Sequence, residues 1–493
     1  MTKRNSADMR RLTFGLSLAF MLLCYAGITL GQVDGREREN KGPKEAAQSD
    51  SRGPAHVMAP FSANPVFDVV LGRVEERSIT VSLLAYQSDM SVQLRYGVSG
   101  TALTNQSAIA LRRAAPTHWL LKNLLPDTAY EYQVLASDGV PLANGHFHTA
   151  RPSGSSFTVT VTADSHLDQN TSVPLYRQTL ANALKDGSDF HIDLGDTFMT
   201  EKHADRTGAA QQYLAQRFYF GEVAHSMPLF LALGNHDGEE VRHLRGGADS
   251  LAVWANAQRK NYFANPVPDS FFSGNTTADP LAGELQDYYA WTWGDTLFMV
   301  LDPYWHAPAR RSDERWNLSL GLAQYQWLQS TLAASKVRYK LVFVHQLVGG
   351  SDRQGRGGIE AVPFGEWGGS NADGSPGMAE HRPGFSEPIH ALLKRHGVTA
   401  VFHGHDHLFA AQSIDGIAYQ EVPQPGHPAS IYARMAADYG YLQGVVRGDS
   451  GHLRIRVEPQ QLRVDFIGSE LDRNGKATGN NGRLLHSYVL QPR

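Results

Sequence analysis

The sequence predicts an α/β (α+β) domain built in layers, preceded by a small all-β sandwich. Residues 64–149 alternate polar and apolar side chains at the period-two spacing of strands. From Phe157 onward, short apolar strands alternate with helical segments. The 493 residues are 42% hydrophobic and 19% charged, as in globular proteins. At about 150 residues per domain, this length allows two or three domains.

Residues 1–31 have the pattern of an export signal. Four basic residues lie among the first eleven, and an apolar run at 12–30 contains the single cysteine, Cys24. An uncleaved anchor is the alternative, because the run is close to the length that spans a bilayer. In either case we expect export, to the periplasm, the extracellular space or the membrane surface. Membrane contact is expected only through this segment.

Two regions follow the predicted signal. Residues 32–60 are rich in charged residues, Ser, Gly and Pro, and are predicted to be a disordered linker. Residues 61–150 form the predicted sandwich. Its turn Leu-Pro-Asp-Thr at 125–128 leads into a strand with Tyr130 and Tyr132 at period two. This stretch resembles a fibronectin type III module, which we interpret as a structural spacer or a lid.

Residues 155–493 form the predicted layered domain. Apolar strands are expected at 157–161, 190–194, 229–233, 341–344 and 398–402. Helices are expected at 174–186 and 388–396, each closed by the glycine that follows it. The alternating segments 453–457 and 462–466 predict a terminal hairpin that completes a sheet.

Polar motifs stand where five of these strands end. They are Asp164-Ser165-His166, Gly195-Asp196, Gly234-Asn235-His236-Asp237, His345 and Gly404-His405-Asp406-His407. Because ligands of open α/β sheets collect beyond the carboxyl ends of the strands, we expect these side chains at one rim. Each motif alone is more often a turn or a surface group. Together, they supply enough nitrogen and oxygen ligands for two metal ions of the Zn, Mn or Fe type.

The five motifs, in this order, resemble those of the calcineurin-like metallophosphoesterase superfamily. The resemblance covers residues 157–466 and implies a four-layer β-sandwich flanked by helices. It also implies a binuclear centre of divalent or trivalent Fe, Mn or Zn ions. In that centre, the first metal is held by Asp164, His166 and His407, the second by Asn235, His345 and His405, and Asp196 bridges the two.

The same resemblance assigns catalytic roles. His236 acts beside the leaving group as general acid or charge stabiliser, and Asp237 orients it. The implied reaction is hydrolysis of phosphate esters by a hydroxide that bridges the two metals. Monoesters and diesters are equally open as substrates, and so are small molecules and polymers.

Two other functions compete with this one. A non-catalytic metal-binding receptor or adhesion protein would keep the fold, but the complete ligand set and His236 argue against it. A nuclease is disfavoured because the net charge is −4 and the chain has no block of five basic residues. We therefore expect no nucleic acid partner, and the oligomeric state is left open.

A sandwich followed by a phosphoesterase domain also resembles the purple acid phosphatases. Two positions depart from that family's pattern. His166 stands where the first motif of that family normally has no histidine. Met199 stands three positions after Asp196, where that family carries the tyrosine that colours its iron. We therefore predict an uncoloured enzyme with no strong visible absorption band.

Three residues are candidates for substrate binding. Arg353 and Arg356 lie in a long glycine-rich connection at 349–384, which is predicted to be a functional loop. A guanidinium can bind a phosphate through two hydrogen bonds, although a solvated loop charge is the more ordinary interpretation. His306 follows a predicted strand at 296–301 and is the third candidate.

Overall fold

The computed structural model describes residues 57–61, 64–308, 314–352, 354–428 and 431–493. The predicted export signal with Cys24, most of the linker at 32–60, and Arg353 lie outside these residues. Residues 54–493 form one compact unit. Within the described ranges, every helix is too short or too polar to cross a bilayer.

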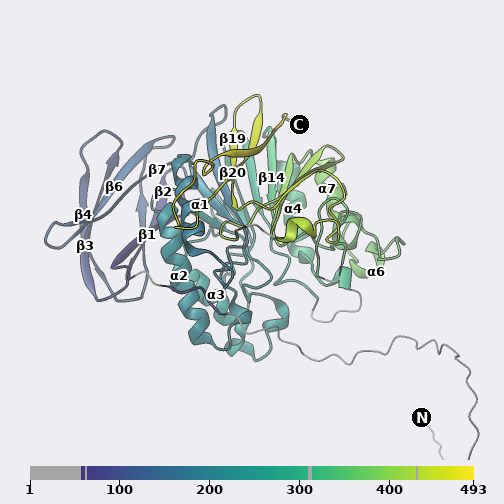
Figure 1. Cartoon of the computed structure of the whole chain (residues 1–493), viewed down its shortest axis with the longest axis horizontal. Helices are drawn as coiled ribbons and strands as arrows, with labels where there is room; N and C mark the ends of the chain where they lie inside the picture. Colours follow the sequence, from purple (N-terminus) through teal and green to yellow (C-terminus); the bar gives the residue numbers. More distant parts are fainter. Residues whose placement is uncertain (1–56, 62–63, 309–313, 353, 429–430) are drawn as a thin grey trace, which may run out of the picture. The chain divides into compact units, whose positions relative to one another are not determined.

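Two small antiparallel sheets come first in the described chain. One contains β1 (Phe67–Gly72), β2 (Ser78–Ala85) and β5 (Thr117–Lys122). The other contains β4 (Thr104–Leu111), β3 (Met90–Val98), β6 (Ala129–Ala136) and β7 (Pro141–His148). Side chains of both sheets, such as Val81 and Tyr132, share one hydrophobic core. The predicted all-β region is therefore present (Figure 1), while its fibronectin type III assignment stays a prediction.

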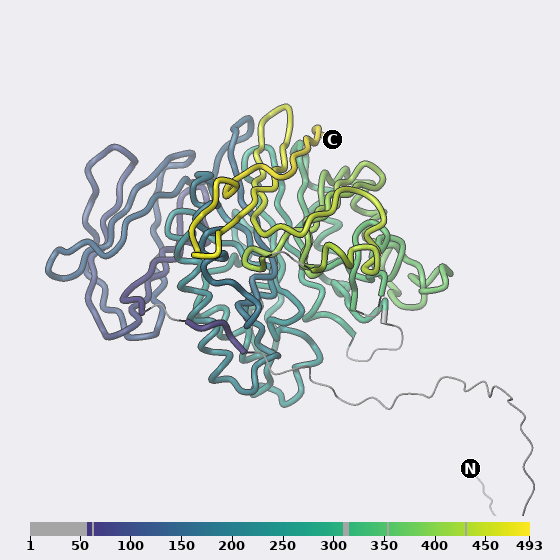
Figure 2. The backbone as a smooth tube through the Cα atoms, viewed as in Figure 1, coloured from purple at the N-terminus to yellow at the C-terminus, as the bar shows by residue number. Residues whose placement is uncertain are grey.

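A six-stranded sheet begins the layered domain, in the order β10-β9-β8-β19-β20-β21. Its parallel half contains β8 (Phe157–Thr162), β9 (Phe190–Asp193) and β10 (Leu229–Leu231). Its antiparallel half contains β19 (Gly451–Val457), β20 (Leu462–Gly468) and β21 (Leu484–Leu490). β19 and β20 are the predicted hairpin, and β19 pairs directly with β8. Figure 2 shows these last strands in yellow.

An eight-stranded sheet has the order β11-β12-β13-β14-β15-β17-β16-β18. Its parallel strands are β13 (Thr296–Val300), β14 (Tyr339–Phe343), β15 (Ala400–His403) and β17 (Ile417–Glu421). The flanking strands are β11 (Ser273–Gly274), β12 (Tyr289–Trp293), β16 (Phe409–Ile414) and β18 (Val445–Arg447). All five parallel strands predicted from the sequence are found in the two large sheets.

The two large sheets enclose a core, and helices cover the outer faces. Phe190 of β9 and Phe298 of β13 meet across the core with ring centroids 5.1 Å apart. α1 (Val173–Lys185) and α2 (Arg206–Ala224) pack together beside the six-stranded sheet, with α3 (Leu251–Tyr262) against α2. α4 (Gly321–Ala334) and α7 (Ile389–Arg395) pack on the eight-stranded sheet. The predicted four layers are confirmed, as are helices at 174–186 and 388–396.

A buried ion pair joins the small sandwich to α2. Arg217 of α2 is fully buried and donates to Asp68 of β1 at 2.8 Å and to the Ser82 hydroxyl of β2 at 2.9 Å. Tyr132 of β6 donates to the His225 carbonyl at the end of α2, at 2.6 Å. The sandwich is therefore attached to the layered domain through these polar contacts and through apolar packing, in which Val70 of β1 shares a cluster with Phe220 of α2 and Leu231 of β10.

Candidate metal centre

The predicted ligands meet beyond the carboxyl ends of five parallel strands. β8, β9 and β10 run toward Asp164, Asp196 and Asn235 in the six-stranded sheet. β14 and β15 run toward His345 and His405 in the eight-stranded sheet. The two sheets therefore contribute ligands to the same edge of the domain, as expected for a site in an α/β fold.

Asp164, His166 and His407 form a first cluster, with one potential ligand atom from each within 4.8 Å of the others. Asp164 Oδ1 lies 3.7 Å from His166 Nε2 and 3.5 Å from His407 Nε2. Two ligands of one ion, each about 2.1 Å from it, are separated by about 3.0–3.4 Å. The spacing of the cluster therefore fits one ion after small adjustments.

Asp196, His345 and His405 form a second cluster by the same criterion. His345 Nε2 lies 3.5 Å from Asp196 Oδ2 and 3.1 Å from Asn235 Oδ1, which adds the amide oxygen to this cluster. Asp196 Oδ2 also lies 3.4 Å from His166 Nε2 of the first cluster. A single carboxylate oxygen thus lies between the two groups of ligands.

Hydrogen bonds to backbone carbonyls determine which histidine nitrogen faces the centre. His345 Nδ1 donates to the Leu194 carbonyl at 2.9 Å, which leaves Nε2 for a metal. His405 Nε2 donates to the Gln354 carbonyl at 2.8 Å, which leaves Nδ1. Such bonds fix the tautomer and the ring orientation of metal-binding histidines.

The carboxylates are held by the backbone of neighbouring motifs. Asp164 Oδ2 accepts a hydrogen bond from the His405 amide at 2.9 Å, and Asp196 Oδ1 accepts one from the His236 amide at 2.8 Å. A side chain at Gly234 would place its Cβ 2.3 Å from Asp196 Oδ1. Glycine is therefore required there by close approach, because the two loops touch.

Local features of the site fit a metal centre. Asp164 Oδ1 and His166 Nε2 are buried and have no hydrogen-bond partner among the described residues. Buried polar atoms are rarely left in this state, and an ion would satisfy both. Five ligand positions also have left-handed backbone angles, with φ of 56° at Asp164, 49° at His166, 54° at Asp196, 83° at His405 and 61° at His407. Strain of this kind concentrates at functional sites.

At Asp164, Asp196 and His405, the electrostatics favour the forms that bind metal. Burial raises the pKa of Asp164, but attraction from the imidazoles of His345, His166 and His407 outweighs it and holds the pKa at about 2. Burial opposes ionisation of Asp196 too, yet attraction from His345 keeps its pKa well below the ordinary value. Burial lowers the pKa of His405 to about 4. The carboxylates are therefore ionised and His405 is neutral near pH 7.

His236 is oriented by Glu201. The His236 Nδ1 atom lies 2.6 Å from Glu201 Oε1. The other Glu201 oxygen accepts hydrogen bonds from Arg242 at 2.7 Å and from His243 at 2.9 Å. The carboxylate is thus held from two sides, and His236 Nε2 is left for a reacting group.

The predicted role of Asp237 as the residue that orients His236 is wrong. The Asp237 carboxylate accepts hydrogen bonds from the backbone amides of Phe198 at 2.7 Å and Gly234 at 2.8 Å. It also accepts one from the Asp196 amide at 3.1 Å. Asp237 is adjacent to His236 in sequence but points back toward the loop that carries Asp196, so it positions a ligand and not the acid.

A cavity of about 340 Å³ lies beside the second cluster, where Asn235, His236 and His405 line it. Gly349, Gln354 and Gly355 also line it, and all three belong to the glycine-rich connection at 349–384. The cavity is therefore placed to receive the group attached to a phosphate bound at the metal centre.

The described candidates for substrate binding lie elsewhere. His306 Nε2 is 3.1 Å from Asp287, and the described lining of the cavity includes neither residue. Arg356 lies over the Tyr439 ring at 4.2 Å and pairs with Asp352 at 3.0 Å. Neither His306 nor Arg356 lines the cavity, so both assignments stay predictions without support from its lining, and Arg353 lies outside the described residues.

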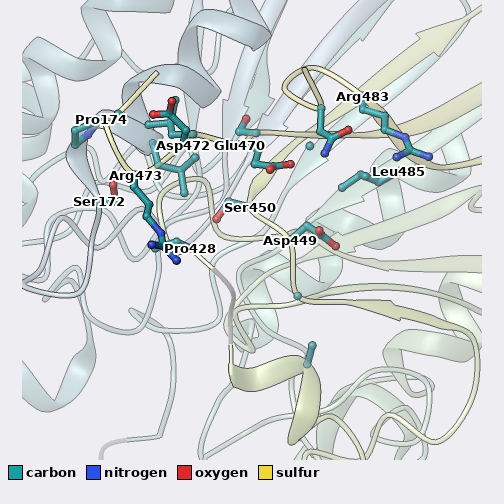
Figure 3. A pocket seen from close by; sticks show the side chains of 18 of the residues that line it. Ser172, Pro174, Pro428, Asp449, Ser450, Glu470, Asp472, Arg473, Arg483 and Leu485 are labelled. Carbon is teal, nitrogen blue, oxygen red and sulfur yellow. The ribbon is translucent and has the colours of Figure 1, made fainter. Parts of the chain in front are cut away.

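A second cavity, of about 960 Å³, lies near the start of α1. Figure 3 shows Glu470, Asp472 and Arg473 from one loop next to Ser172 and Pro174. The described lining of this cavity includes none of the seven predicted metal ligands, so it is separate from the metal centre.

Three further residues at the centre were not predicted from the sequence: Asp168, His427 and Glu201. Asp168 lies 3.8 Å from His166 Nδ1 and 3.6 Å from His427 Nε2. Its position two residues after His166 extends the first motif to Asp-x-His-x-Asp, which was the available signal. His427 follows β17, a further parallel strand with the same direction as β15. Glu201 lies outside every motif, so only the fold reveals it.

Comparisons with known proteins agree with this geometry. The model of the calcineurin-like phosphoesterase family matches residues 157–409, just over half of the chain. Tartrate-resistant acid phosphatase type 5 of Mus musculus is 23% identical over 337 residues, which cover 67% of this chain and 83% of the relative. The Homo sapiens protein is 23% identical over 290 residues, which cover 57% of this chain and 76% of the relative.

Two solved structures share the fold. A structure of PhoD aligns with a TM-score of 0.60 at 15% identity, covering 88% of this chain and 91% of the other. The purple acid phosphatase PPD1 from seeds of yellow lupin, Lupinus luteus, aligns with a TM-score of 0.56 at 14% identity. The alignment covers 85% of this chain and 73% of the other. Taken with the two ligand clusters and the matched family model, the chain belongs to the calcineurin-like phosphoesterase family and is a binuclear-metal hydrolase of phosphate esters.

Proposed function

We propose that Asp164, His166 and His407 hold one metal ion, that Asn235, His345 and His405 hold the other, and that Asp196 bridges them. The observation that carries this assignment is the position of Asp196 Oδ2, at 3.4 Å from His166 Nε2 and 3.5 Å from His345 Nε2. Imidazole, carboxylate and amide ligands suit Fe, Mn or Zn. Two such ions supply Lewis acidity at phosphorus and activate water near neutral pH.

The chain's own residues then complete the reaction. His236 lines the cavity beside the second cluster, and Glu201 accepts a hydrogen bond from its Nδ1 atom. This leaves His236 Nε2 to give a proton to the departing ester oxygen. Asp237 keeps the Asp196 loop in place through its backbone hydrogen bonds.

The test measures metal content and turnover together. Wild type loaded with Mn, Zn or Fe is assayed with p-nitrophenyl phosphate and with its bis ester, next to Asp196→Asn and His236→Ala. We expect Asp196→Asn to lose bound metal and activity together. His236→Ala should keep the metal and lose about 100-fold in kcat. The ratio of kcat/KM for the phosphate to kcat/KM for its bis ester decides between a monoesterase and a diesterase. Metal-loaded protein that hydrolyses neither substrate would instead be a non-catalytic receptor.

We also propose that the enzyme is exported. The support is the apolar run at 12–30 behind four basic residues, followed by a charged stretch. Fractionation of producing cells and amino-terminal sequencing of the mature protein test this. A full-length chain recovered only with cytoplasmic markers would contradict it.

A further inference from the structure

The cavity beside His236 has a polar lining. Among its described residues, Leu318 is the one with an apolar side chain, and Phe, Tyr and Trp are absent. Cavities for small molecules are usually lined mainly by hydrophobic and aromatic side chains. A polar wall is a poor surface for an apolar alcohol, because polar groups lose water there without gaining hydrogen bonds.

Most polar groups of this wall already have protein partners. Glu201 is held by His236 and Arg242. Gln346 accepts a hydrogen bond from the Tyr304 hydroxyl at 2.9 Å and donates to the Gln354 carbonyl at 3.3 Å. These side chains shape the wall, and their hydrogen-bonding capacity is largely occupied.

Asn317 differs from them. It lines the same cavity and is 6% exposed, and its Oδ1 atom has no hydrogen-bond partner among the described residues. An unpaired buried amide oxygen is unfavourable unless a bound molecule donates to it. Because Asn317 lines the cavity, a hydroxyl group of a molecule bound there is the donor that could satisfy this oxygen.

We propose that the alcohol released by this enzyme is a small polyol or sugar, with a hydroxyl that donates to Asn317. This rests on the proposed function, because it assigns the cavity to the leaving group. The volume of about 340 Å³ is near the lower end for small-molecule sites, so the alcohol is small. Alkyl and lipid alcohols carry no hydroxyl group that could donate to Asn317 once the ester bond is formed.

The test compares esters whose leaving groups have similar intrinsic reactivity. Glycerol 3-phosphate is paired with n-propyl phosphate, and glucose 6-phosphate with n-hexyl phosphate, on the metal-loaded wild type. We expect kcat/KM to favour the hydroxylated member of each pair by at least about tenfold. Equal values, or a preference for the alkyl ester, would overturn the proposal.

Variants of Asn317 test whether this residue causes the preference for hydroxylated esters over alkyl esters. Asn317→Leu should reduce the hydroxyl preference at least about fivefold, because the acceptor is replaced by an apolar group of similar size. Asn317→Asp keeps the shape and an acceptor, and should retain the preference. The matched control is Asn474→Leu, an exposed residue in the loop after β20. An unchanged preference in Asn317→Leu that keeps the wild-type Tm would contradict the role of Asn317.

The two proposals fail in different ways. If p-nitrophenyl phosphate is hydrolysed but the hydroxylated esters are no better than the alkyl esters, the inference about the alcohol is wrong and the phosphoesterase assignment holds. If the metal-loaded enzyme hydrolyses none of these esters, the proposed function itself is wrong.

Discussion

Glu201 illustrates how one buried carboxylate can set the role of a histidine. Burial raises the pKa of Glu201, but hydrogen bonds from His236 and His243 outweigh it and keep the pKa well below the ordinary value. Glu201 is therefore ionised throughout the working range of pH. An ionised acceptor at Nδ1 fixes the tautomer of His236 and the orientation of its ring.

Replacing Glu201 tests this arrangement. Glu201→Gln keeps the size but removes the charge, so we expect kcat to fall about 10–100-fold while both metals are retained. The acidic and basic limits of the kcat–pH profile should also move, which a merely structural role would not cause. Control measurements use Glu380→Gln, in α6 (Met378–His381) of the glycine-rich connection. An unchanged pH profile in Glu201→Gln would refute the positioning role.

His345 predicts how metal binding depends on pH. Burial lowers the pKa of His345, but attraction from Asp196 and Asp164 outweighs it and raises the pKa to about 9 in the metal-free protein. A metal ion must displace this proton, so the apparent affinity rises with pH until about pH 9 and falls as the pH is lowered. Chelator competition for Zn between pH 6 and pH 9 measures the trend, and proton release appears in calorimetry with different buffers. A flat affinity profile would contradict it.

The sequence was sufficient to predict which side chains gather at the proposed metal centre and insufficient to predict the groups that orient them. Asp164, Asp196 and His405 stand directly after apolar strands, where strand direction alone brings side chains together. Glu201 and Asn317 lie in connections whose path depends on tertiary packing. The error at Asp237 has the same origin, since adjacency to His236 does not determine which way a side chain points.

The end of α1 is tied to β19 by a charged group. Asp186 follows the last turn of α1, where a negative charge opposes the helix dipole. Arg454 and His452, both in β19, offset this with contacts to Asp186 at 2.7 Å and 2.8 Å. These contacts join a helix on one face of the six-stranded sheet to the strand that pairs with β8.

The contacts of Asp186 with Arg454 and His452 make the free energy of unfolding depend on pH in a defined direction. Burial raises the pKa of Asp186, but the hydrogen bonds from His452 and Arg454 outweigh it and lower the pKa. A lowered acid pKa gives stabilisation that is present above the unfolded value of about 3.9 and is lost as pH falls through the folded pKa. Asp186→Asn should therefore lower the unfolding free energy at pH 7 by about 1 kcal/mol, allowing for solvent screening.

Urea unfolding at several pH values checks this expectation. The difference between Asp186→Asn and wild type should shrink as the pH falls below about 4. Asp438→Asn, at an exposed position, is the control and should match wild type throughout. A difference that stays constant down to low pH would mean that the ion pairs are not its source.

Helix prediction succeeded for α1 and missed α2 for a physical reason. In α1, Leu180 and Ala183 are buried at the spacing of one helical face. In α2, buried residues include the polar Gln212, Gln216 and Arg217, because the helix packs on both the sandwich and the layered domain. A helix that is buried on several sides by polar contacts has no single apolar stripe to detect.

The joint between the sandwich and the layered domain depends on Arg217. Arg217→Met removes one partner of a buried pair and leaves Asp68 without its cation, so we expect a loss of about 3 kcal/mol in unfolding free energy. Arg177→Met is the control, because the Arg177 side chain is 54% exposed and pairs with Glu222 at the surface. Arg177→Met should change the unfolding free energy by no more than about 1 kcal/mol. Urea unfolding measures both, and equal losses would contradict the special role of Arg217.

The pairing of β19 with β8 has a consequence for biosynthesis. β8 comes before Asp164 in the chain, yet its neighbour on one side is made almost three hundred residues later. Until residues 451–457 leave the ribosome, β8 presents an open edge of unpaired amides and carbonyls to other chains. Completion of this sheet, and with it full ordering of the Asp164 loop and metal uptake, is therefore expected to follow synthesis of β19.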